Sequence, residues 1–321
     1  MTVSRGTGRG LRLAVSLGLL ALVLWLAHWQ SVIGVLERVA GGWVFVAVCL
    51  SAADRLVCNY RWQILLAARG VPVGFLRLFV VQLGANFFGS FLPSSVGIDA
   101  IRIAAICRAG EPTAPVIAAT LIDRVSKGIA TFLFGSLAIL TLAGQQRIPH
   151  DLRQVVLYST LAIVIITLAA FHPAVWRRVR LRLLLRLPER WGTAVSAVAE
   201  ASLAFRRNGS ALLAVTLLAV GLFAIRILCI KALTLACGVE IPIASLVLII
   251  PIIWIILMLP VTIGNIGLQD ASYVALMSLI GVGAPIAVSL SLLEHLITRL
   301  ACLPGAFLFD TLALRKRQTV A

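Results

Sequence analysis

The amino-acid sequence predicts an all-α polytopic membrane protein, on three observations. Of its 321 residues, 61% are hydrophobic, and the mean hydropathy is +1.05. Only 12% are charged, whereas a soluble domain carries roughly 25%. The apolar residues also form continuous, helix-length runs, and not the alternating ten-residue segments of an outer-membrane barrel.

The net charge and the possible metal ligands fit this class. A net charge of +16 is typical of nucleic-acid-binding proteins, but the membrane explains it better, because most basic residues lie between the apolar runs. The six cysteines are scattered without a C-x-x-C pair, and the four histidines show no metal-binding spacing. We therefore expect no nucleic-acid partner, no metal and no cofactor.

Several apolar runs are long enough for full transmembrane helices. The first resembles a signal peptide, but no A-x-A-like cleavage site follows it, so we expect an uncleaved span with a cytoplasmic N-terminus. The last is followed by basic residues, which places the C-terminus in the cytoplasm as well. The six expected spans are residues 13–29, 41–60, 115–143, 154–171, 211–236 and 286–314.

Two similar stretches interrupt the apolar sequence, at residues 92–97 and 259–264. Both read Leu-Pro-x-(Ser/Thr)-(Val/Ile)-Gly, and each is followed by an aspartate, Asp99 or Asp270. Proline removes a backbone donor and glycine frees the chain to bend, so both stretches predict helix breaks. Paired breaks in corresponding segments indicate a transporter binding site; the alternative is two extramembrane loops.

Charge placement favours re-entrant hairpins over loops. If residues 75–108 crossed the membrane, Arg108 and every later basic loop would fall on the wrong side. We therefore expect a hairpin at 75–108 that enters from the cytoplasm and a second one at 243–279 that enters from outside. With these two hairpins, the later basic residues lie on the cytoplasmic side. Arg61 follows the second span, and its charge suits the cytoplasmic side. The two hairpins would have opposite orientations, as in an inverted repeat.

The chain is expected to form one transmembrane domain, residues 1–321, with halves 1–171 and 210–321 around a basic segment at 172–209. The leucine and arginine pattern of this segment predicts an amphipathic helix on the anionic inner leaflet. A lipid-headgroup site or a partner site is the alternative. The arginines concerned are Arg177, Arg178, Arg180, Arg182, Arg186, Arg190, Arg206 and Arg207.

Ionisable residues within the apolar segments are the best guide to a site, since a charge at the bilayer centre costs at least about 2.5–3.5 kcal/mol. Asp123 and Lys127 have the spacing of an intrahelical ion pair. Arg226 and Lys231 have no acid on their own helix, so we expect either a functional role for them or pairing across helices with Asp99, Asp270 or Glu294. Asp54 and Arg55 are expected near the inner end of the second span, where long side chains reach water.

The ionisable residues within the apolar segments carry a small surplus of positive charge, which favours an anionic ligand such as a phosphate headgroup. The seven cations are Arg55, Arg102, Arg124, Lys127, Arg226, Lys231 and Arg299, and the five acids are Asp54, Asp99, Asp123, Asp270 and Glu294. Helices that begin after Gly97 and Gly267 would add backbone donors and positive dipole ends. The candidate substrate-binding residues are Pro93, Ser94, Ser95, Gly97, Asp99, Arg102, Asp123, Arg124, Lys127, Arg226, Lys231, Pro260, Thr262, Gly264, Asn265, Gly267, Asp270, Glu294 and Arg299.

Four motifs give the sequence a family resemblance. They are Arg61-Trp62, Leu92-Pro93 with Gly97-x-Asp99-x-x-Arg102, Asp123-Arg124, and Leu259-Pro260 with Gly264 to Asp270. On these, the chain resembles the flippase-like family that includes the membrane region of lysylphosphatidylglycerol synthases. The resemblance implies a bacterial or archaeal inner-membrane protein connected with lipid translocation. In the synthases, this region moves the aminoacylated lipid between leaflets.

The sequence departs from the family pattern at several positions. The family commonly has glycine at Ile98 and at Asn265, arginine at Gln269 and glutamate at Asp270. Only seven residues follow Leu314, which leaves no room for an aminoacyl-transfer domain. We therefore do not expect this chain to synthesise lysyl-lipid.

Three functions compete, and a purely structural role is a fourth alternative. The first is a flippase in which Arg102, Arg226, Lys231 or Arg299 holds an anionic headgroup while acidic residues orient these cations or carry a coupling proton. The second is an accessory subunit of a glycosyltransferase or lipid-modifying enzyme. The third, an enzyme acting on a lipid-linked phosphate, is disfavoured because His295 lacks a matching nucleophile motif. Membrane lipids are the expected ligands, and a homo-oligomer or an enzyme complex stays open.

Overall fold

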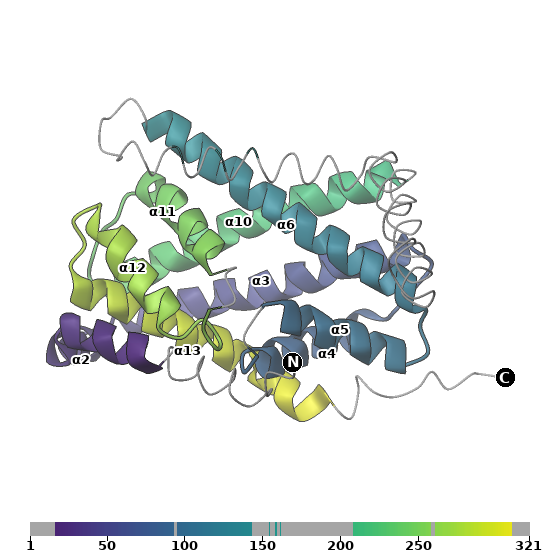
Figure 1. Ribbon diagram of the computed structural model, residues 1–321, viewed down its shortest axis with the longest axis horizontal. Coiled ribbons are helices and arrows are strands. Elements are labelled where there is room, and N and C mark those ends of the chain that lie inside the picture. Colours follow the sequence, from purple (N-terminus) through teal and green to yellow (C-terminus); the bar gives the residue numbers. More distant parts are fainter. Residues whose placement is uncertain are drawn as a thin grey trace, which may run out of the picture. The chain divides into compact units, whose positions relative to one another are not determined.

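The computed structural model describes residues 17–92, 95–142, 208–257 and 261–309, together with residues 154, 158 and 161. Every regular element in these ranges is a helix (Figure 1). Helix Leu17–Leu26 comes first. It is followed by α2 (Trp29–Glu37), α3 (Gly41–Ala67), α4 (Phe75–Gly89), α5 (Ser95–Arg108), α6 (Thr113–Leu142), α10 (Gly209–Ala236), α11 (Ile243–Ile256), α12 (Leu268–Ser278) and α13 (Ala284–Leu308).

Three of the described helices, α3, α10 and α13, are long and apolar enough to cross a membrane. Helix Leu17–Leu26 and α2 would form a fourth span if the bent pair is counted as one. Helix α6 has 30 residues, but it carries Asp123, Arg124 and Lys127. The expected span at 154–171, apart from three isolated residues, and the arginines from Arg177 to Arg207 lie outside the described ranges. The count of six full spans therefore stays a prediction.

The first apolar run is not one straight helix. Helix Leu17–Leu26 and α2 meet at an angle of 80°. His28 makes this bend with a left-handed φ of 54°, which ends the first helix and lets a new one begin at Trp29. A single span at residues 13–29 was predicted here, and α2 was not expected.

Helix α3 extends further than predicted. It continues through Arg61 and Trp62 to Ala67, and both side chains are fully buried. The helix was predicted to end at Tyr60, because an arginine follows this residue. Two corrections result: Arg61 is not a solvated loop residue, and Asp54 and Arg55 lie at the middle of α3, with Asp54 buried. Burial of Arg61 and Asp54 is tolerated because Asp123 of α6 lies within ion-pair distance of Arg61, and Arg226 of α10 within ion-pair distance of Asp54.

Both expected helix breaks are present. The first, residues 90–94, separates α4 from α5, and the second, residues 257–267, separates α11 from α12. Helix α12 begins after Gly267 as predicted, whereas α5 begins at Ser95, two residues before Gly97. A Cβ added to Gly89 would collide with Ile98. The end of α4 and the start of α5 therefore pack tightly across the first break. Whether either hairpin is re-entrant stays a prediction.

The chain divides into two compact units, each assembled from separate stretches. The first, here called the break unit, comprises Met1–Arg55, Gln82–Ile101 and Ala224–Phe309. The second, the Asp123 unit, comprises Leu56–Val81, Arg102–Phe223 and Asp310–Ala321. Helices α3, α4, α5 and α10 contribute a part to each unit.

Within the break unit, α13 packs against α12 and α2, and α11 packs against α12. Val23, Ala27, Val32 and Val288 form a buried apolar cluster between the first helices and α13. Helix α13 also makes a backbone-to-backbone contact with α4, since a Cβ added to Gly305 would collide with the main chain of Leu83 and Gly84. These contacts fix the positions of α4, α11 and α12, three of the helices that flank the two breaks.

Candidate functional site

The two breaks meet in the break unit. Gly264, in the second break, has a left-handed φ of 59°, and Asn265 after it has a φ of 60°. A Cβ added to Gly264 would collide with the carbonyl oxygen of Ser90 in the first break. The chain therefore needs glycine here both for its conformation and for the close approach. This contact brings residues of the two breaks together.

Asp270 fixes the end of the second break. Its Oδ2 accepts a hydrogen bond of 2.9 Å from the amide of Gly267, the N-cap residue of α12. Its Oδ1 accepts a hydrogen bond of 2.6 Å from the Ser291 hydroxyl and lies 4.0 Å from Nε2 of His295. The carboxylate is fully buried. Asp270 thus caps α12, and the Gly267 amide expected to contact a ligand is already occupied.

We expect Asp270→Ala to destabilise the protein. It leaves the amide of Gly267 and the hydroxyl of Ser291 without their carboxylate partner, at about 1–3 kcal/mol for each buried group. Thermal unfolding in detergent, followed by tryptophan fluorescence, should show a clear fall in Tm. Ser278→Ala is the control, because Ser278 is an exposed residue on the same helix. Equal Tm values for the two variants would contradict a capping role for Asp270.

A cavity of about 230 Å³ lies where the breaks meet, and we call it the break cavity. Its basic residues are Arg55 from α3 and Arg299 from α13, and no acidic residue is among the described residues that line it. Nη2 of Arg299 donates a hydrogen bond of 3.3 Å to the carbonyl of Gly264. A guanidinium has five N–H donors, so this contact leaves donors for a ligand. The other polar lining residues are Asn86, Ser90, Asn265, Gln269, His295 and Thr298.

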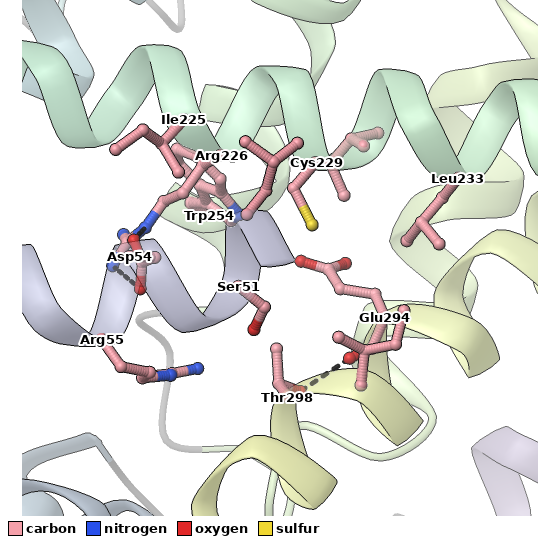
Figure 2. A pocket seen from close by; sticks show the side chains of 13 residues that line it. Ser51, Asp54, Arg55, Ile225, Arg226, Cys229, Leu233, Trp254, Glu294 and Thr298 are labelled. Atoms are coloured by element: carbon pink, nitrogen blue, oxygen red, sulfur yellow. Dashed lines mark hydrogen bonds and ion pairs between the residues drawn. The ribbon is translucent and has the colours of Figure 1, made fainter. Parts of the chain in front are cut away.

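A second cavity, of about 190 Å³, shares Arg55 and Thr298 with the break cavity. We call it the Glu294 cavity (Figure 2). Two acids, Asp54 and Glu294, and two arginines, Arg55 and Arg226, are among its lining residues. Its formal charge is therefore balanced when both carboxyl groups are ionised. This balance distinguishes it from the break cavity, whose described lining is basic.

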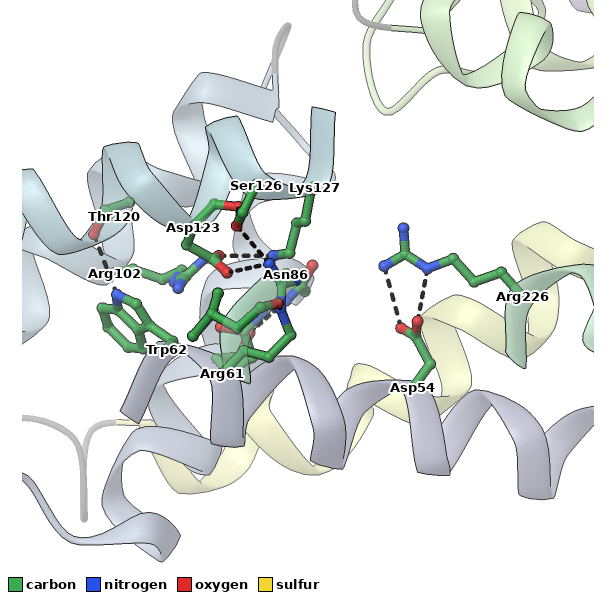
Figure 3. Close-up of polar contacts among 12 residues, drawn as sticks. Asp54, Arg61, Trp62, Asn86, Arg102, Thr120, Asp123, Ser126, Lys127 and Arg226 are labelled. Carbon is green, nitrogen blue, oxygen red and sulfur yellow. Dashed lines mark hydrogen bonds and ion pairs between the residues drawn. The ribbon is translucent and has the colours of Figure 1, made fainter. Parts of the chain in front are cut away.

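Arg226 is held within the Glu294 cavity by Asp54. Nε of Arg226 donates to Oδ1 of Asp54 at 2.6 Å, and Nη2 donates to Oδ2 at 3.4 Å (Figure 3). The guanidinium also lies 5.5 Å from the ring centre of Trp254, a cation–π distance. Asp54 was not among the acids expected to pair with Arg226. Lys231 donates instead to the carbonyl of Ile241 at 2.7 Å, and no ion pair links it to an acid in the described ranges.

Glu294 extends from α13 toward Cys229 on α10 and Ser51 on α3 (Figure 2). Its Oε2 accepts two hydrogen bonds, one of 2.5 Å from the Tyr273 hydroxyl and one of 2.9 Å from the Gln269 amide. Residues of helix α12 therefore have two roles. Asp270 caps the helix, whereas Gln269 and Tyr273 orient the carboxyl group of Glu294.

The Asp123 unit contains a separate cluster of buried charges, here called the Asp123 cluster (Figure 3). Asp123 lies 2.7 Å from Nζ of Lys127, 3.4 Å from Nη2 of Arg61 and 3.5 Å from Nη1 of Arg102. Arg61, Arg102 and Asp123 are buried, whereas the Lys127 side chain is 28% exposed. The predicted intrahelical pair of Asp123 and Lys127 is thus part of a three-cation cluster.

Hydrogen bonds and an aromatic ring hold the Asp123 cluster in place. Arg61 donates to Ser126 Oγ at 2.7 Å and to the carbonyl of Val215 at 3.1 Å. The guanidinium of Arg102 lies 4.0 Å from the ring centre of Trp62, whose indole N–H donates to Thr120 at 3.2 Å. Close packing of this kind indicates a structural role.

The structure thus divides the predicted site residues into groups. Arg102, Asp123 and Lys127 form the Asp123 cluster, and Arg124 lies beside them on α6. In the break unit, the break cavity is lined by Gly264, Asn265 and Arg299. The Glu294 cavity is lined by Arg226 and Glu294. Thr262 is buried in the second break, and Gly97 and Asp99 lie in the first turns of α5. The remaining three, Gly267, Asp270 and Lys231, make the structural contacts described above. Pro93, Ser94, Pro260 and the side chain of Ser95 lie outside the described residues.

Several cavity residues were not predicted from the sequence. Arg55 was interpreted as a residue at the water interface because α3 was ended too early. His295 was considered only as a catalytic base, and its Nε2 has no hydrogen-bond partner in the described part of the chain. Asn86 and Ser90 precede the first Leu-Pro motif by only a few residues. A search for polar residues just before each break would have found them.

Apolar helices of spanning length, two helix breaks in contact and buried charge clusters define a multi-pass helical membrane protein. A comparison with family models matches residues 11–305 to the family described as the lysylphosphatidylglycerol synthase TM region. The chain belongs to this family, which confirms the resemblance based on the four motifs. A search among curated proteins gave no match. The family assignment indicates a function connected with membrane lipids.

Proposed function

We propose that this protein moves an anionic, phosphate-bearing lipid between the leaflets of the cell's inner membrane, with the headgroup passing through the break cavity. The observation that carries the proposal is the lining of this cavity. Arg55 and Arg299 lie there, and no acid does so among the described lining residues. Arginine offers several donors in the planar geometry that suits phosphate oxygens.

The size of the cavity supports the passage of a headgroup alone. At about 230 Å³, it is smaller than the roughly 300–1,000 Å³ of pockets that enclose whole drug-sized ligands. The acyl chains would therefore remain in the bilayer while the headgroup crosses. The amide groups of Asn86 and Asn265 would replace part of the water that a phosphate gives up.

The membrane arrangement belongs to the same proposal. The two hairpins enter from opposite faces, the chain has six full spans, and both termini are cytoplasmic. Transport is expected to involve no covalent chemistry on the lipid. An accessory role beside a glycosyltransferase depends on the basic segment at 172–209, and no observation on the described residues favours it.

Arg299→Ala is expected to slow lipid transport by about tenfold or more, since a hydrogen bond to a charged group contributes about 1.5–3 kcal/mol. The protein is reconstituted into liposomes that contain fluorescent NBD-phosphatidylglycerol. Transport is measured as the fraction of probe that becomes accessible to the impermeant reductant dithionite. Arg299→Lys should retain part of the activity, because it keeps the charge but loses the planar donor group.

Arg108→Ala is the matched control, since Arg108 is an exposed arginine at the end of α5. It should transport the probe like the wild type. Transport by Arg299→Ala at the wild-type rate would exclude the break cavity as the route. Wild-type protein with no transport of NBD-phosphatidylglycerol above protein-free liposomes would contradict the proposed function and favour an accessory role.

A further inference from the structure

We propose that Glu294 is a proton-binding site, and that its protonation favours binding of the anionic headgroup in the adjoining break cavity. The linkage rests on the proposed function, whereas the proton site itself does not. Glu294 lies near the middle of α13, a helix long and apolar enough to span the membrane. An ionisable residue in the middle of a spanning helix is costly to bury, so its presence indicates a functional role.

The hydrogen bonds of Glu294 leave one oxygen for a proton. Oε2 already accepts from the Tyr273 hydroxyl and the Gln269 amide. Oε1 has no hydrogen-bond partner among the described residues, and the carboxyl group is part of the cavity lining. A proton taken from cavity water therefore binds Oε1, while both existing hydrogen bonds to Oε2 remain. Protonation requires no rearrangement of α12.

The charge of the cavity lining shows why this proton affects an anion. With Glu294 ionised, Asp54 and Glu294 balance Arg55 and Arg226. Asp54 is committed to Arg226 through two hydrogen bonds. Protonation of Glu294 therefore removes one of the two negative charges of this lining, which then carries a net positive charge. Because Arg55 and Thr298 line both cavities, the change acts directly on a phosphate in the break cavity.

Other titratable groups near Glu294 are already engaged or belong to the other cavity. Asp270 is buried as the cap of α12, with Ser291 and Gly267 as donors. His295, next to Glu294, lies in the break-cavity lining beside Arg299, so it is the main competitor for a pH effect. The charged and titratable groups around Glu294 are Asp54 and Arg55 of α3, Arg226 and Cys229 of α10, Asp270 and Tyr273 of α12, and His295 of α13.

The consequence is reciprocal linkage between a proton and a headgroup. Proton binding raises the affinity for the anion, and a bound anion favours protonation by the same factor. Affinity is therefore highest on the acidic side of the Glu294 titration and falls as the pH rises through it. If the headgroup crosses with its proton, a proton gradient would give the transport a direction.

Two measurements on the full-length protein test this. The first is binding of dioctanoyl phosphatidylglycerol from mildly acidic to mildly alkaline pH. Wild-type affinity should fall about tenfold across this range, within the usual magnitude of such couplings. Glu294→Gln, which keeps the acceptor for Tyr273 and carries no charge, should bind tightly at every pH. Glu240→Gln, the same change at an exposed residue, should behave like the wild type.

The second measurement is infrared difference spectroscopy without lipid. The carbonyl band of a protonated carboxylic acid should appear as the pH falls, and Glu294→Gln should lack it. Absence of this band in the wild type would overturn the proton site. Unchanged pH dependence in Glu294→Gln, or its loss in His295→Gln instead, would overturn the linkage. A band that titrates normally without lipid binding at any pH would refute the linkage and the proposed function, but not the proton site.

Discussion

Asp123→Asn is expected to lower the free energy of unfolding by about 3–5 kcal/mol, the cost of removing one partner from a buried ion pair. The substitution is nearly isosteric, so the loss comes from charge and not from a cavity. It leaves Arg61 and Arg102, both buried, without the carboxylate that lies 3.4 and 3.5 Å from them. The measurement is the apparent Tm in detergent, together with the yield of monodisperse protein in size-exclusion chromatography.

A double-mutant cycle separates the charge effect from general damage. Lys127→Met alone should cost less than about 1 kcal/mol, because this lysine is partly exposed. Combined with Asp123→Asn, it removes one of the three cations and should restore part of the lost Tm. If the double variant is no more stable than Asp123→Asn, repulsion among the remaining cations does not cause the instability.

Gly264→Ala is expected to reduce transport of NBD-phosphatidylglycerol to the level of protein-free liposomes. The added Cβ would collide with the main-chain oxygen of Ser90, which has no rotamer through which to move away. The second break must then shift, and the Gly264 carbonyl that accepts from Arg299 shifts with it. Overpacking of this kind costs about 1–3 kcal/mol, in addition to about 1–2 kcal/mol for a left-handed alanine, so Tm should fall as well.

Gly281→Ala is the matched control for this experiment. Gly281 has a φ of 81°, but a Cβ added there has no atom within 4 Å. The variant carries the conformational penalty without a collision, so we expect a modest fall in Tm and normal transport. Equal loss of transport in both variants would show that backbone strain alone, and not the contact between the two breaks, impairs the protein.

Local spacing in the sequence predicted local structure well. The Leu-Pro-x-(Ser/Thr)-(Val/Ile)-Gly pattern predicted both breaks, because proline and glycine act on the residues next to them. The four-residue spacing of Asp123 and Lys127 predicted their ion pair, since such residues share a helix face. The start of α12 after Gly267 was predicted for the same kind of reason.

Contacts between distant residues could not be predicted in this way. Asp54 and Arg226 are 172 residues apart, and only tertiary packing decides which acid reaches this arginine. The end of α3 was misjudged because Arg61 was taken as a sign of the membrane surface, whereas Asp123, Ser126 and Val215 compensate it in the interior. The meeting of Gly264 with Ser90 likewise depends on packing between the hairpins.

The backbone contact of Gly84 on α4 with Gly305 on α13 limits how the break unit can rearrange. With no side chains between the two main chains, neither helix can slide along the other at this point without separating from it. The crossing therefore acts as a pivot: the two helices can scissor about it, but they cannot shear. Opening and closing at the breaks would then be angular movements of helix ends, with amplitude that grows with distance from the glycine pair.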